Sequence, residues 1–492
     1  MRVFITGATG LVGRALTLRL RRDGHTVVAW SRSAQRVAQR LGGEAQAASG
    51  GPDEMREAID GCDAVVTLAG EPILPGRWTA RKKTAMRRSR VDLNQTVVAA
   101  ILETTNRPKV IVAGSAVGFY GDTKDTVVSE DDGPGEGYLA NLNQAWEAVF
   151  EPAAKAGIRV VWGRTGIVLA PDGGALESLL PVTRIGLSGP MGSGRQGVPW
   201  IHIDDHVEAL MLALLSPQAH GPINLVGPTS TPQRNFAKAI GRAVHRPAFA
   251  PAPSFAMRLL LGEAASALLD GQFVQPDRLQ RLGFVHRFQQ LDESLSDILS
   301  TQRIHLKRLH STPDVDHGAS YLNRARPTHE LTSSRVVPCP PAEVWAFFSD
   351  ARNLANLSPM NAGMTMGEAP LSVTTGSRFS HQLTLGPITL PWEGEIIACE
   401  QEQRFIDVQH RGPFRTWWHA HGFEATSLPD GSIGTRITDR VLFRSPLGLI
   451  GRAITWAYVG PQLLSLFAYR DLALRRRFGE FTEDHTPTAP SS

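Results

Sequence analysis

Short β-branched apolar runs alternate with longer stretches of helical periodicity through the first third of the chain. The apolar runs lie at residues 3–5, 26–30, 64–68, 109–113 and 159–162. This alternation is typical of βαβ units, in which helices connect parallel strands across the faces of a sheet. The pattern therefore predicts an α/β fold built on a doubly wound parallel sheet.

The pattern loosens between about residues 170 and 300, where helical stretches are separated by Pro/Gly turns. We expect this part to form a smaller cap that completes a cleft. The boundaries we expect are a sheet domain over residues 1–230 and a cap over residues 231–300. Residues 301–329 lose periodicity and are rich in His and Arg, so we interpret them as an interdomain linker.

A second pattern begins near Glu330. It predicts a strand at 331–337, a helix at 341–348, further strands at 394–398, 404–410, 416–425 and 435–443, and a long apolar helix at 447–478. A run of strands closed by a long helix favours an α+β domain, here an antiparallel sheet that grips a helix. We assign this helix-grip domain to residues 330–478. The polar, Pro-rich tail at 479–492 is expected to be disordered.

Composition narrows the class of protein. With 492 residues, 42% hydrophobic and 20% charged, the chain is expected to form two or three ordinary globular domains. The net charge of +4 is small, and no basic stripe with interleaved aromatics is present, so we expect no nucleic-acid partner. No run reaches the roughly 18 apolar residues of a membrane span, so we expect no stable membrane insertion. Three widely spaced cysteines favour a reducing compartment, and we expect a cytoplasmic protein.

A glycine-rich loop follows the first apolar run and leads into the first helical stretch. Small residues there let the backbone approach a pyrophosphate, and the start of the helix offers N–H groups and a positive dipole to it. This context predicts a Rossmann dinucleotide site. The residues expected to contact the cofactor phosphates are Gly7, Thr9, Gly10, Leu11, Val12 and Gly13.

Two further segments bear on the cofactor. Ser31 and Arg32 follow the second apolar run, where an acidic residue would bind the ribose of NAD; a hydroxyl and a guanidinium instead suit a 2′-phosphate, so we predict NADP. The segment Leu68, Ala69, Gly70 ends the third run, where small residues permit contact with the nicotinamide side. Arg164 ends another run and is expected either to meet the cofactor or an anionic substrate, or to form a buried ion pair.

Spaced motifs over the first 300 residues resemble one known family. They lie at residues 68–73, 77–78, 89–91, 114–121, 146–147, 164–169, 192–196 and 200–205, with further matches at 246–247, 261–263 and 283–284. The chain resembles the extended, or atypical, short-chain dehydrogenase/reductases labelled epimerase family proteins, which are NAD-dependent epimerase/dehydratase-like and carry a C-terminal signature domain. The resemblance implies the fold and the cofactor more directly than it implies a substrate.

The resemblance also names candidate catalytic residues. Active short-chain dehydrogenases use a Ser to orient the substrate, a Tyr to transfer a proton and a Lys four residues later to lower the pKa of that Tyr. Ser115 fits the first role, and Tyr138, at the start of a helical stretch, fits the second, but its fourth successor is Leu142. Tyr120 has Lys124 at the right spacing but in a loop, so we interpret that match as chance and expect Tyr120 to face the substrate.

Residues 330–478 resemble the START-like, polyketide-cyclase-like (SRPBCC) domains through 338–345 and 417–423. The resemblance implies an apolar cavity for a hydrophobic ligand. The aromatic residues that either line this cavity or form the core are Trp392, Trp417, Trp418 and Phe423. His419 and His421 share one face of a predicted strand, but no third ligand is evident near them in the sequence, so we expect no metal.

Two functional hypotheses follow. The first is an NADP-dependent oxidoreductase or epimerase-like enzyme that acts on a small-molecule substrate and is fused to a hydrophobic-ligand-binding domain. The alternative is a non-catalytic NADP-binding sensor or scaffold. Leu142 in place of the lysine favours the alternative, whereas Ser115 and Tyr138 favour catalysis. The pattern specifies neither the substrate nor an oligomeric state.

Overall fold

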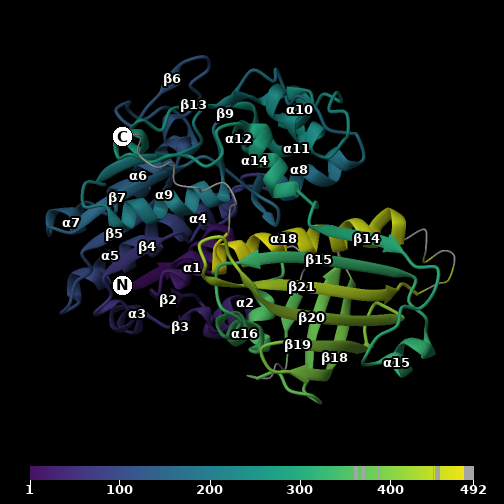
Figure 1. The fold of residues 1–492 in the computed structure, drawn as a ribbon. Helices are drawn as coiled ribbons and strands as arrows, with labels where there is room; N and C mark the ends of the chain where they lie inside the picture. The colour runs from purple at the N-terminus through teal and green to yellow at the C-terminus, as the bar shows by residue number, and fades with distance from the viewer. Residues whose placement is uncertain are drawn as a thin grey trace, which may run out of the picture. The chain divides into compact units, whose positions relative to one another are not determined.

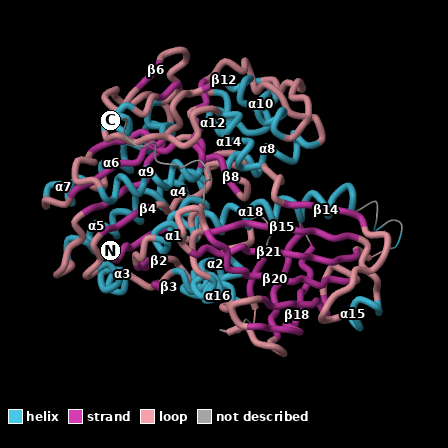
Figure 2. Tube along the Cα trace, in the orientation of Figure 1, coloured by secondary structure: helices cyan, strands magenta, loops and turns pink. Residues whose placement is uncertain are grey.

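The computed structural model describes residues 1–359, 364–367, 372–385, 388–446, 448, 451 and 455–480. The chain divides into two compact units (Figure 1). The first comprises Met1–Ala38 and Glu44–Leu299, and the second comprises Gln39–Gly43 and Ser300–Ser492. Figure 2 shows helices throughout the first unit and long strands in the second.

A seven-stranded sheet forms the centre of the first unit, in the order β11-β7-β5-β4-β1-β2-β3. All neighbouring strands in it are parallel. The strands are β1 (Arg2–Thr6), β2 (Thr26–Trp30), β3 (Gln46–Ala48), β4 (Ala64–Thr67), β5 (Val110–Ala116), β7 (Arg159–Thr165) and β11 (Gly221–Leu225). The five apolar runs of the sequence coincide with β1, β2, β4, β5 and β7, which confirms the predicted doubly wound α/β fold; the edge strands β3 and β11 were not predicted.

Helices connect the strands of this sheet. They are α1 (Leu11–Arg22), α2 (Ala34–Leu41), α3 (Pro52–Ile59), α4 (Ala80–Arg87), α5 (Leu93–Glu103), α6 (Tyr138–Ala148), α7 (Glu151–Lys155) and α9 (Ile203–Leu215). The chain leaves β1 towards one edge of the sheet and leaves β4 towards the other, so right-handed connections place α1 and α5 on opposite faces. Residues of α3, α5 and α6 share one hydrophobic core with β1, β4 and β5.

Short paired strands and helices complete the first unit. The pairs are β8 (Ile167–Ala170) with β10 (Trp200–His202), β9 (Gly197–Val198) with β12 (Thr231–Pro232), and β6 (Val127–Val128) with β13 (Phe273–Val274). The helices are α8 (Gly174–Arg184), α10 (Gln233–Ala243), α11 (Ser254–Leu261), α12 (Ser266–Leu269), α13 (Asp277–Arg281) and α14 (Leu291–Leu299). Trp200, Phe236 and Leu295 belong to a separate buried cluster here.

The second unit contains an eight-stranded antiparallel sheet in the order β14-β15-β21-β20-β19-β18-β17-β16. The strands are β14 (Ile304–Arg308), β15 (His329–Val337), β16 (Met364–Met366), β17 (Arg378–Leu385), β18 (Ile388–Glu400), β19 (Arg404–Arg411), β20 (Thr416–Ser427) and β21 (Ile433–Arg444). Its helices include α15 (Ala319–Arg324), α16 (Pro341–Phe348) and α18 (Gly460–Phe478). The predicted run of strands followed by a long helix is therefore present.

Part of the expected linker is instead structured. Within residues 301–329, β14 pairs with β15 along its whole length, and Leu322 of α15 is buried. The strand was missed because it is polar at alternate positions and lies at the edge of the sheet. The closing helix expected over 447–478 is present in the described part of that range: residues 448 and 451 are helical, and a π-helical turn at Thr455–Val459 leads into α18. The predicted disordered tail lies outside the described residues from 481 onward.

The two faces of the second sheet bury different aromatic residues. Trp392 and Trp417 share a core with Phe467 of α18, whereas Trp418 belongs to a different core with Leu322 of α15. Successive strand residues point to opposite faces, so Trp418 lies on the face away from α18 and takes the core role of the two that were left open. The ring of Phe423 packs against Trp345 and Phe348 of α16. All four predicted lining residues are buried.

Among the described residues, no helix is long and apolar enough to cross a membrane.

Candidate functional site

The order of the strands reverses direction between β1 and β4, and their carboxyl ends therefore flank a crevice. The N–H of Leu68, directly after β4, donates to the carbonyl oxygen of Thr6 at the end of β1 (2.9 Å). The glycine loop and the segment after β4 thus lie side by side. This is the position in which open α/β sheets bind nucleotides.

Two glycines of the loop are required by close backbone contacts. Gly7 has φ +76°, and a Cβ on it would lie 2.6 Å from the backbone nitrogen of Ala69. A Cβ on Gly13 would overlap the carbonyl oxygen of Gly7. The loop is therefore tight enough to bring its N–H groups up to a pyrophosphate, and the residues present fit a dinucleotide.

The start of α1 is available to an anion. Gly10 is the N-cap residue of α1, and its N–H donates to the carbonyl oxygen of Gly7 (2.9 Å). Because glycine has no side chain, Gly10 cannot cap the backbone N–H groups of Val12 and Gly13, which an N-cap side chain would reach. These groups and the helix dipole together favour a phosphate. Thr9 lies in the same turn and is partly exposed.

Ser31 and Arg32 lie at the carboxyl end of β2, as predicted. The N–H of Ser31 donates to the carbonyl oxygen of Ala48 (3.0 Å), and its Oγ accepts a bond from the N–H of Ser33 (3.4 Å). The side chain of Arg32 is exposed. An exposed guanidinium beside a fixed serine can meet a 2′-phosphate without breaking any contact of the fold.

Residues after β4 are held by an arginine that the sequence did not single out. A Cβ on Gly70 would lie 3.0 Å from the guanidinium of Arg90, which donates to the carbonyl oxygen of Glu71 (2.9 Å). Lys82 forms an ion pair with the Glu71 side chain (2.8 Å). Arg90 lies in one of the family-like motifs, at 89–91, and that motif was the available signal.

Ser115 belongs to a buried ion-pair network. Its hydroxyl donates to Glu147 Oε1 (2.6 Å), and Arg164 donates to both carboxylate oxygens of Glu147 (2.9 Å each). Arg164 is 4% exposed. Of the two roles left open for Arg164, the geometry is that of a buried ion pair. The network also commits the Ser115 proton to Glu147.

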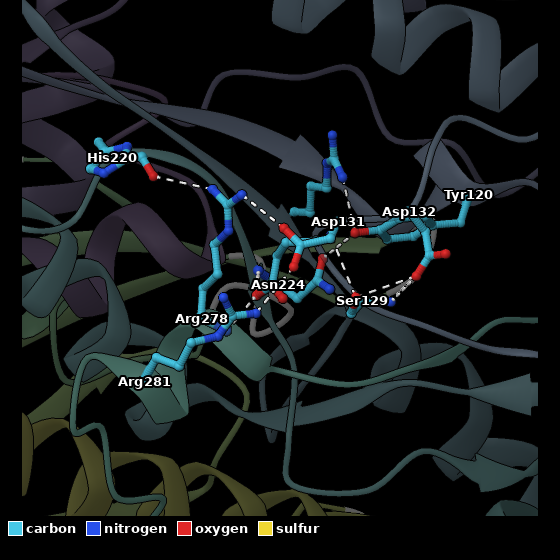
Figure 3. Close-up of polar contacts among 10 residues, drawn as sticks. Tyr120, Ser129, Asp131, Asp132, His220, Asn224, Arg278 and Arg281 are labelled. Carbon is cyan, nitrogen blue, oxygen red and sulfur yellow. Dashed lines mark hydrogen bonds and ion pairs between the residues drawn. The ribbon is translucent and has the colours of Figure 1, made fainter.

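Tyr120 extends this network towards β11. Its hydroxyl accepts a bond from Arg164 (2.9 Å) and donates to Asn224 Oδ1 (2.8 Å; Figure 3). Tyr120 is 4% exposed, and burial raises the pKa of its phenol. This burial contradicts the expectation that Tyr120 faces a substrate. Figure 3 also shows Asp131 bonded to Arg278 (3.1 Å) and Arg281 (3.2 Å).

Tyr138 is half-buried at the first position of α6. Its hydroxyl donates to the backbone carbonyl of Lys83 (3.1 Å), and the Lys83 ammonium lies 4.6 Å from the centre of its ring. Burial raises the pKa of Tyr138, and the charge of Lys83 opposes that rise. Leu142 is buried in the core, so it brings no cation to Tyr138. Lys83 lies in a charged helical stretch that gave no sequence signal.

Two of the three predicted catalytic residues, Ser115 and Tyr120, are joined in one network through Glu147 and Arg164, whereas the Tyr138 hydroxyl donates to Lys83 instead. Tyr138 begins α6, and Glu147, the partner of Ser115, lies near its end, about 14 Å along the helix axis.

Of the predicted cofactor residues, the glycine loop and the segment Leu68, Ala69, Gly70 lie side by side at the β1/β4 crevice. Ser31 and Arg32 lie at the end of the neighbouring strand β2, and Arg164 lies in the buried ion pair.

The comparisons with known proteins agree with this geometry. Residues 3–227 match the model of the NAD dependent epimerase/dehydratase family, and residues 252–298 match a domain of unknown function, DUF1731. An epimerase family protein of Mycobacterium bovis is 40% identical over 60% of this chain and 96% of its own length. The mouse epimerase family protein SDR39U1 is 37% identical over 61% of this chain and 100% of its own length. The chain belongs to the NAD dependent epimerase/dehydratase family.

Solved structures of other epimerase family members share the fold of the first unit. The crystal structure of human epimerase family protein SDR39U1 with NADPH is 35% identical, with a TM-score of 0.55, over 61% of this chain and 99% of that one. A nucleoside-diphosphate sugar epimerase from Corynebacterium glutamicum is 30% identical, with a TM-score of 0.50, over 61% of this chain and 58% of that one. The resemblance noted in the sequence of the first unit is therefore confirmed.

Proposed function

We propose that the first unit binds NADP(H) in the crevice between β1 and β4. The observation that carries this proposal is the glycine cradle, in which Gly7 and Gly13 leave no room for a Cβ. NADP(H) supplies or accepts a hydride when bound. The chain itself contributes the N–H groups of the α1 start for the pyrophosphate. The human relative at 35% identity was crystallised with NADPH, which supports the same cofactor here.

Arg32 is proposed to select NADP(H) over NAD(H). A charge-assisted bond to the 2′-phosphate contributes about 1.5–3 kcal/mol, which corresponds to roughly 10- to 100-fold in affinity. Fluorescence titration of the full chain with NADPH and NADH tests this. Arg32→Ala should weaken NADPH binding at least about tenfold and leave NADH binding unchanged, whereas Arg56→Ala, on α3, should change neither. An unaltered preference in Arg32→Ala would refute the assignment.

The function that the geometry supports best is NADP(H) binding without the serine–tyrosine–lysine chemistry of active short-chain dehydrogenases. The Ser115 proton is committed to Glu147, and the Tyr120 hydroxyl is buried between Arg164 and Asn224. A sensor or scaffold that responds to NADP(H) needs only the crevice. Such a protein should bind NADPH and leave it unoxidised.

A second candidate is an oxidoreductase or epimerase-like enzyme that acts on a small molecule. The position of Lys83 beside the Tyr138 ring favours it, because this ammonium, which also pairs with Glu263 (2.6 Å), lowers the pKa of the phenol against the larger effect of burial. Tyr138 would then transfer the proton, with Lys83 in place of the lysine absent at Leu142. Stoichiometric NADPH oxidation with a panel of carbonyl compounds separates the two. Turnover that Tyr138→Phe abolishes and Tyr120→Phe retains supports the enzyme; the absence of turnover across the panel supports the binding protein.

For the second unit, we propose a START-like domain that binds a hydrophobic ligand. The antiparallel sheet, the closing helix α18 and the aromatic face of Trp392 and Trp417 support this. Tryptophan fluorescence of the full chain, titrated with fatty acids and polycyclic aromatic compounds, tests the proposal. Saturable quenching at micromolar concentration is expected, and its absence for both classes would count against the domain assignment.

We also propose a cytoplasmic location. Cys62, Cys339 and Cys399 carry free thiols, which fits a reducing compartment. Fractionation of cells that produce the chain tests this directly.

A further inference from the structure

A cluster of ionisable side chains lies buried on one face of the second sheet. His419 and His421 project from β20, and Asp407 of β19 is the register partner of His419. Asp439 of β21 is the register partner of His421. None of these four side chains is more than 9% exposed. Their positions two residues apart, or directly opposite across the ladder, put them on the same face of the sheet.

Three ligand atoms converge in this cluster. Asp407 Oδ2 lies 3.2 Å from His421 Nε2 and 3.7 Å from His419 Nδ1. The centres of the two imidazole rings are 3.8 Å apart. A tetrahedral ion with bonds of about 2.0–2.1 Å places its ligand atoms about 3.3 Å from one another. The two distances from Asp407 Oδ2 are near this value, and the ligand atoms of the three residues all lie within 4.8 Å of one another.

The opposite ring nitrogens are held by one carboxylate. Asp439 Oδ1 lies 3.1 Å from His419 Nε2 and 3.1 Å from His421 Nδ1. When both of these nitrogens donate to Asp439, both remaining lone pairs point towards Asp407. A carboxylate behind a ligating histidine is the usual arrangement in metal sites, where it fixes the tautomer and the ring orientation. Asp439 is itself held by Arg470 (2.8 and 3.0 Å) and by the Ser333 hydroxyl (3.0 Å).

The charge balance of the cluster also calls for a cation. With both imidazoles neutral, as metal ligation requires, Asp407 and Asp439 bring two negative charges, and Arg470 brings one positive charge. The surroundings are apolar, with the Phe405 ring 4.2 Å from His421 and the Phe467 ring 5.9 Å from His419. A buried excess charge is costly unless it is compensated.

The alternative explanation of this cluster is a hydrogen-bonded arrangement without a metal ion. Arg470 Nη2 lies 3.1 Å from His421 Nδ1, so Arg470 can donate to His421 while His421 Nε2 donates to Asp407. That arrangement leaves the excess negative charge in place. It also leaves the Nδ1 lone pair of His419 facing Asp407 at 3.7 Å. The converging ligand atoms therefore favour an ion.

We propose that Asp407, His419 and His421 bind a divalent transition-metal ion of the zinc type, and that Asp439 orients both histidines. Two imidazoles and one carboxylate suit such an ion, and three protein ligands leave a fourth position for water or a polar group of a bound molecule. The sequence suggested no third ligand because Asp407 lies on another strand, 12 residues before His419. In the structure, Asp407 is the third ligand. The expectation of no metal had rested on the lack of such a ligand near the two histidines in the sequence.

Metal content and cobalt spectroscopy of the full chain test this site. The chain is produced in cells grown with added zinc and then purified. Mass spectrometry should then detect about one bound zinc ion per molecule. After removal with a chelator, titration with Co²⁺ should give the visible absorption bands of tetrahedral cobalt, saturating at one equivalent. His419→Gln and His421→Gln should each lose these bands. The matched control is His410→Gln, which removes an exposed histidine of β19 that pairs with Glu395 and should leave the bands intact.

Asp439→Asn separates orientation of the ligands from general stability. It should bind Co²⁺ about 10- to 100-fold more weakly and shift the bands, whereas a purely structural role would leave the spectrum of bound cobalt unchanged. If the histidine variants fail to fold, measurements on the wild-type chain are sufficient to test the metal site. Zn²⁺ should then raise the melting temperature of the wild-type chain and displace bound Co²⁺ from it. Wild-type chain that holds no stoichiometric metal and gives no cobalt bands, or equal loss of the bands in His410→Gln, would overturn the proposal.

Discussion

At the scale of single residues, Glu147 is the centre of the buried polar structure in the first unit. It accepts from Ser115 and, through both oxygens, from Arg164. The Arg164 side chain is 5% exposed and that of Glu147 is 12% exposed, so neither charge is well hydrated by itself. Removing one charge of such a pair costs far more than the pair contributes, because the other charge stays buried.

Glu147→Gln should therefore lower the free energy of unfolding of the first unit by about 3 kcal/mol. Ser115→Ala, which removes a single hydroxyl donor, should lower it by about 1 kcal/mol. Urea unfolding monitored by circular dichroism provides both values. Glu151→Gln, on the exposed start of α7, is the control and should change the free energy by less than about 0.5 kcal/mol. A Glu147→Gln variant as stable as this control would show that Arg164 is stabilised by other groups.

His206 makes the stability of the first unit depend on pH. Burial lowers the pKa of His206 to about 4, against an ordinary value of 6.5. Between these values the unfolded chain binds a proton that the folded chain does not, so this contribution to stability is complete above pH 6.5 and is lost as pH falls to about 4. The loss amounts to at most about 3 kcal/mol. His206→Gln should flatten the pH dependence of urea unfolding over this range, and His220→Gln, at an exposed position, should not. Equal slopes in the two variants would mean that His206 is protonated in the folded chain.

At the scale of elements, the turn from β1 into α1 carries the nucleotide site. Inside a helix, alanine normally stabilises the folded state by about 1 kcal/mol relative to glycine. At Gly13 the added Cβ would overlap the carbonyl oxygen of Gly7, so the usual gain is reversed by a clash within the phosphate loop. Function and stability therefore point in the same direction at this position.

Gly13→Ala should abolish NADPH binding and destabilise the first unit. Gly133→Ala is the matched control, because a Cβ there meets no atom within 4 Å. Fluorescence titration with NADPH and thermal unfolding of both variants give the comparison. If Gly13→Ala bound NADPH as tightly as the wild type, the loop would be able to widen, and the close contact at Gly13 would not be required for cofactor binding.

The elements that could be predicted from the sequence are those with a strong local pattern. The inner parallel strands, such as β4 and β5, are buried on both faces and appear as apolar runs, whereas the exposed edge strand β3 does not. The glycine loop has a fixed spacing after β1. β14 was missed because an edge strand keeps polar residues at alternate positions. The network of Ser115, Glu147 and Arg164 was only partly foreseen, because its partners come from separate elements. Register likewise determines the cluster of Asp407 and His419, and a sequence pattern does not contain register.

At the scale of the whole molecule, the two units differ in how they relate to known proteins. The family matches end at residue 298, and the first unit ends at Leu299. The M. bovis and mouse relatives are matched over 96–100% of their own length by about 60% of this chain. These two relatives thus consist almost entirely of the equivalent of the first unit, and the eight-stranded sheet of this chain lies outside the matched part.

This relation predicts that residues 1–299 suffice for the nucleotide site. Every residue proposed to contact NADP(H) lies before residue 71, and the core shared by β1, β4 and β5 is formed by helices of the same unit. A fragment ending at Leu299 should fold and bind NADPH within about threefold of the full chain, and it should bind no stoichiometric zinc. Isothermal titration calorimetry of the fragment and the full chain with NADPH measures this. Because relatives of this length are complete proteins, a folded fragment with tenfold weaker binding would show that the second unit contributes to the nucleotide site, and the two functions proposed here would then have to be treated as one.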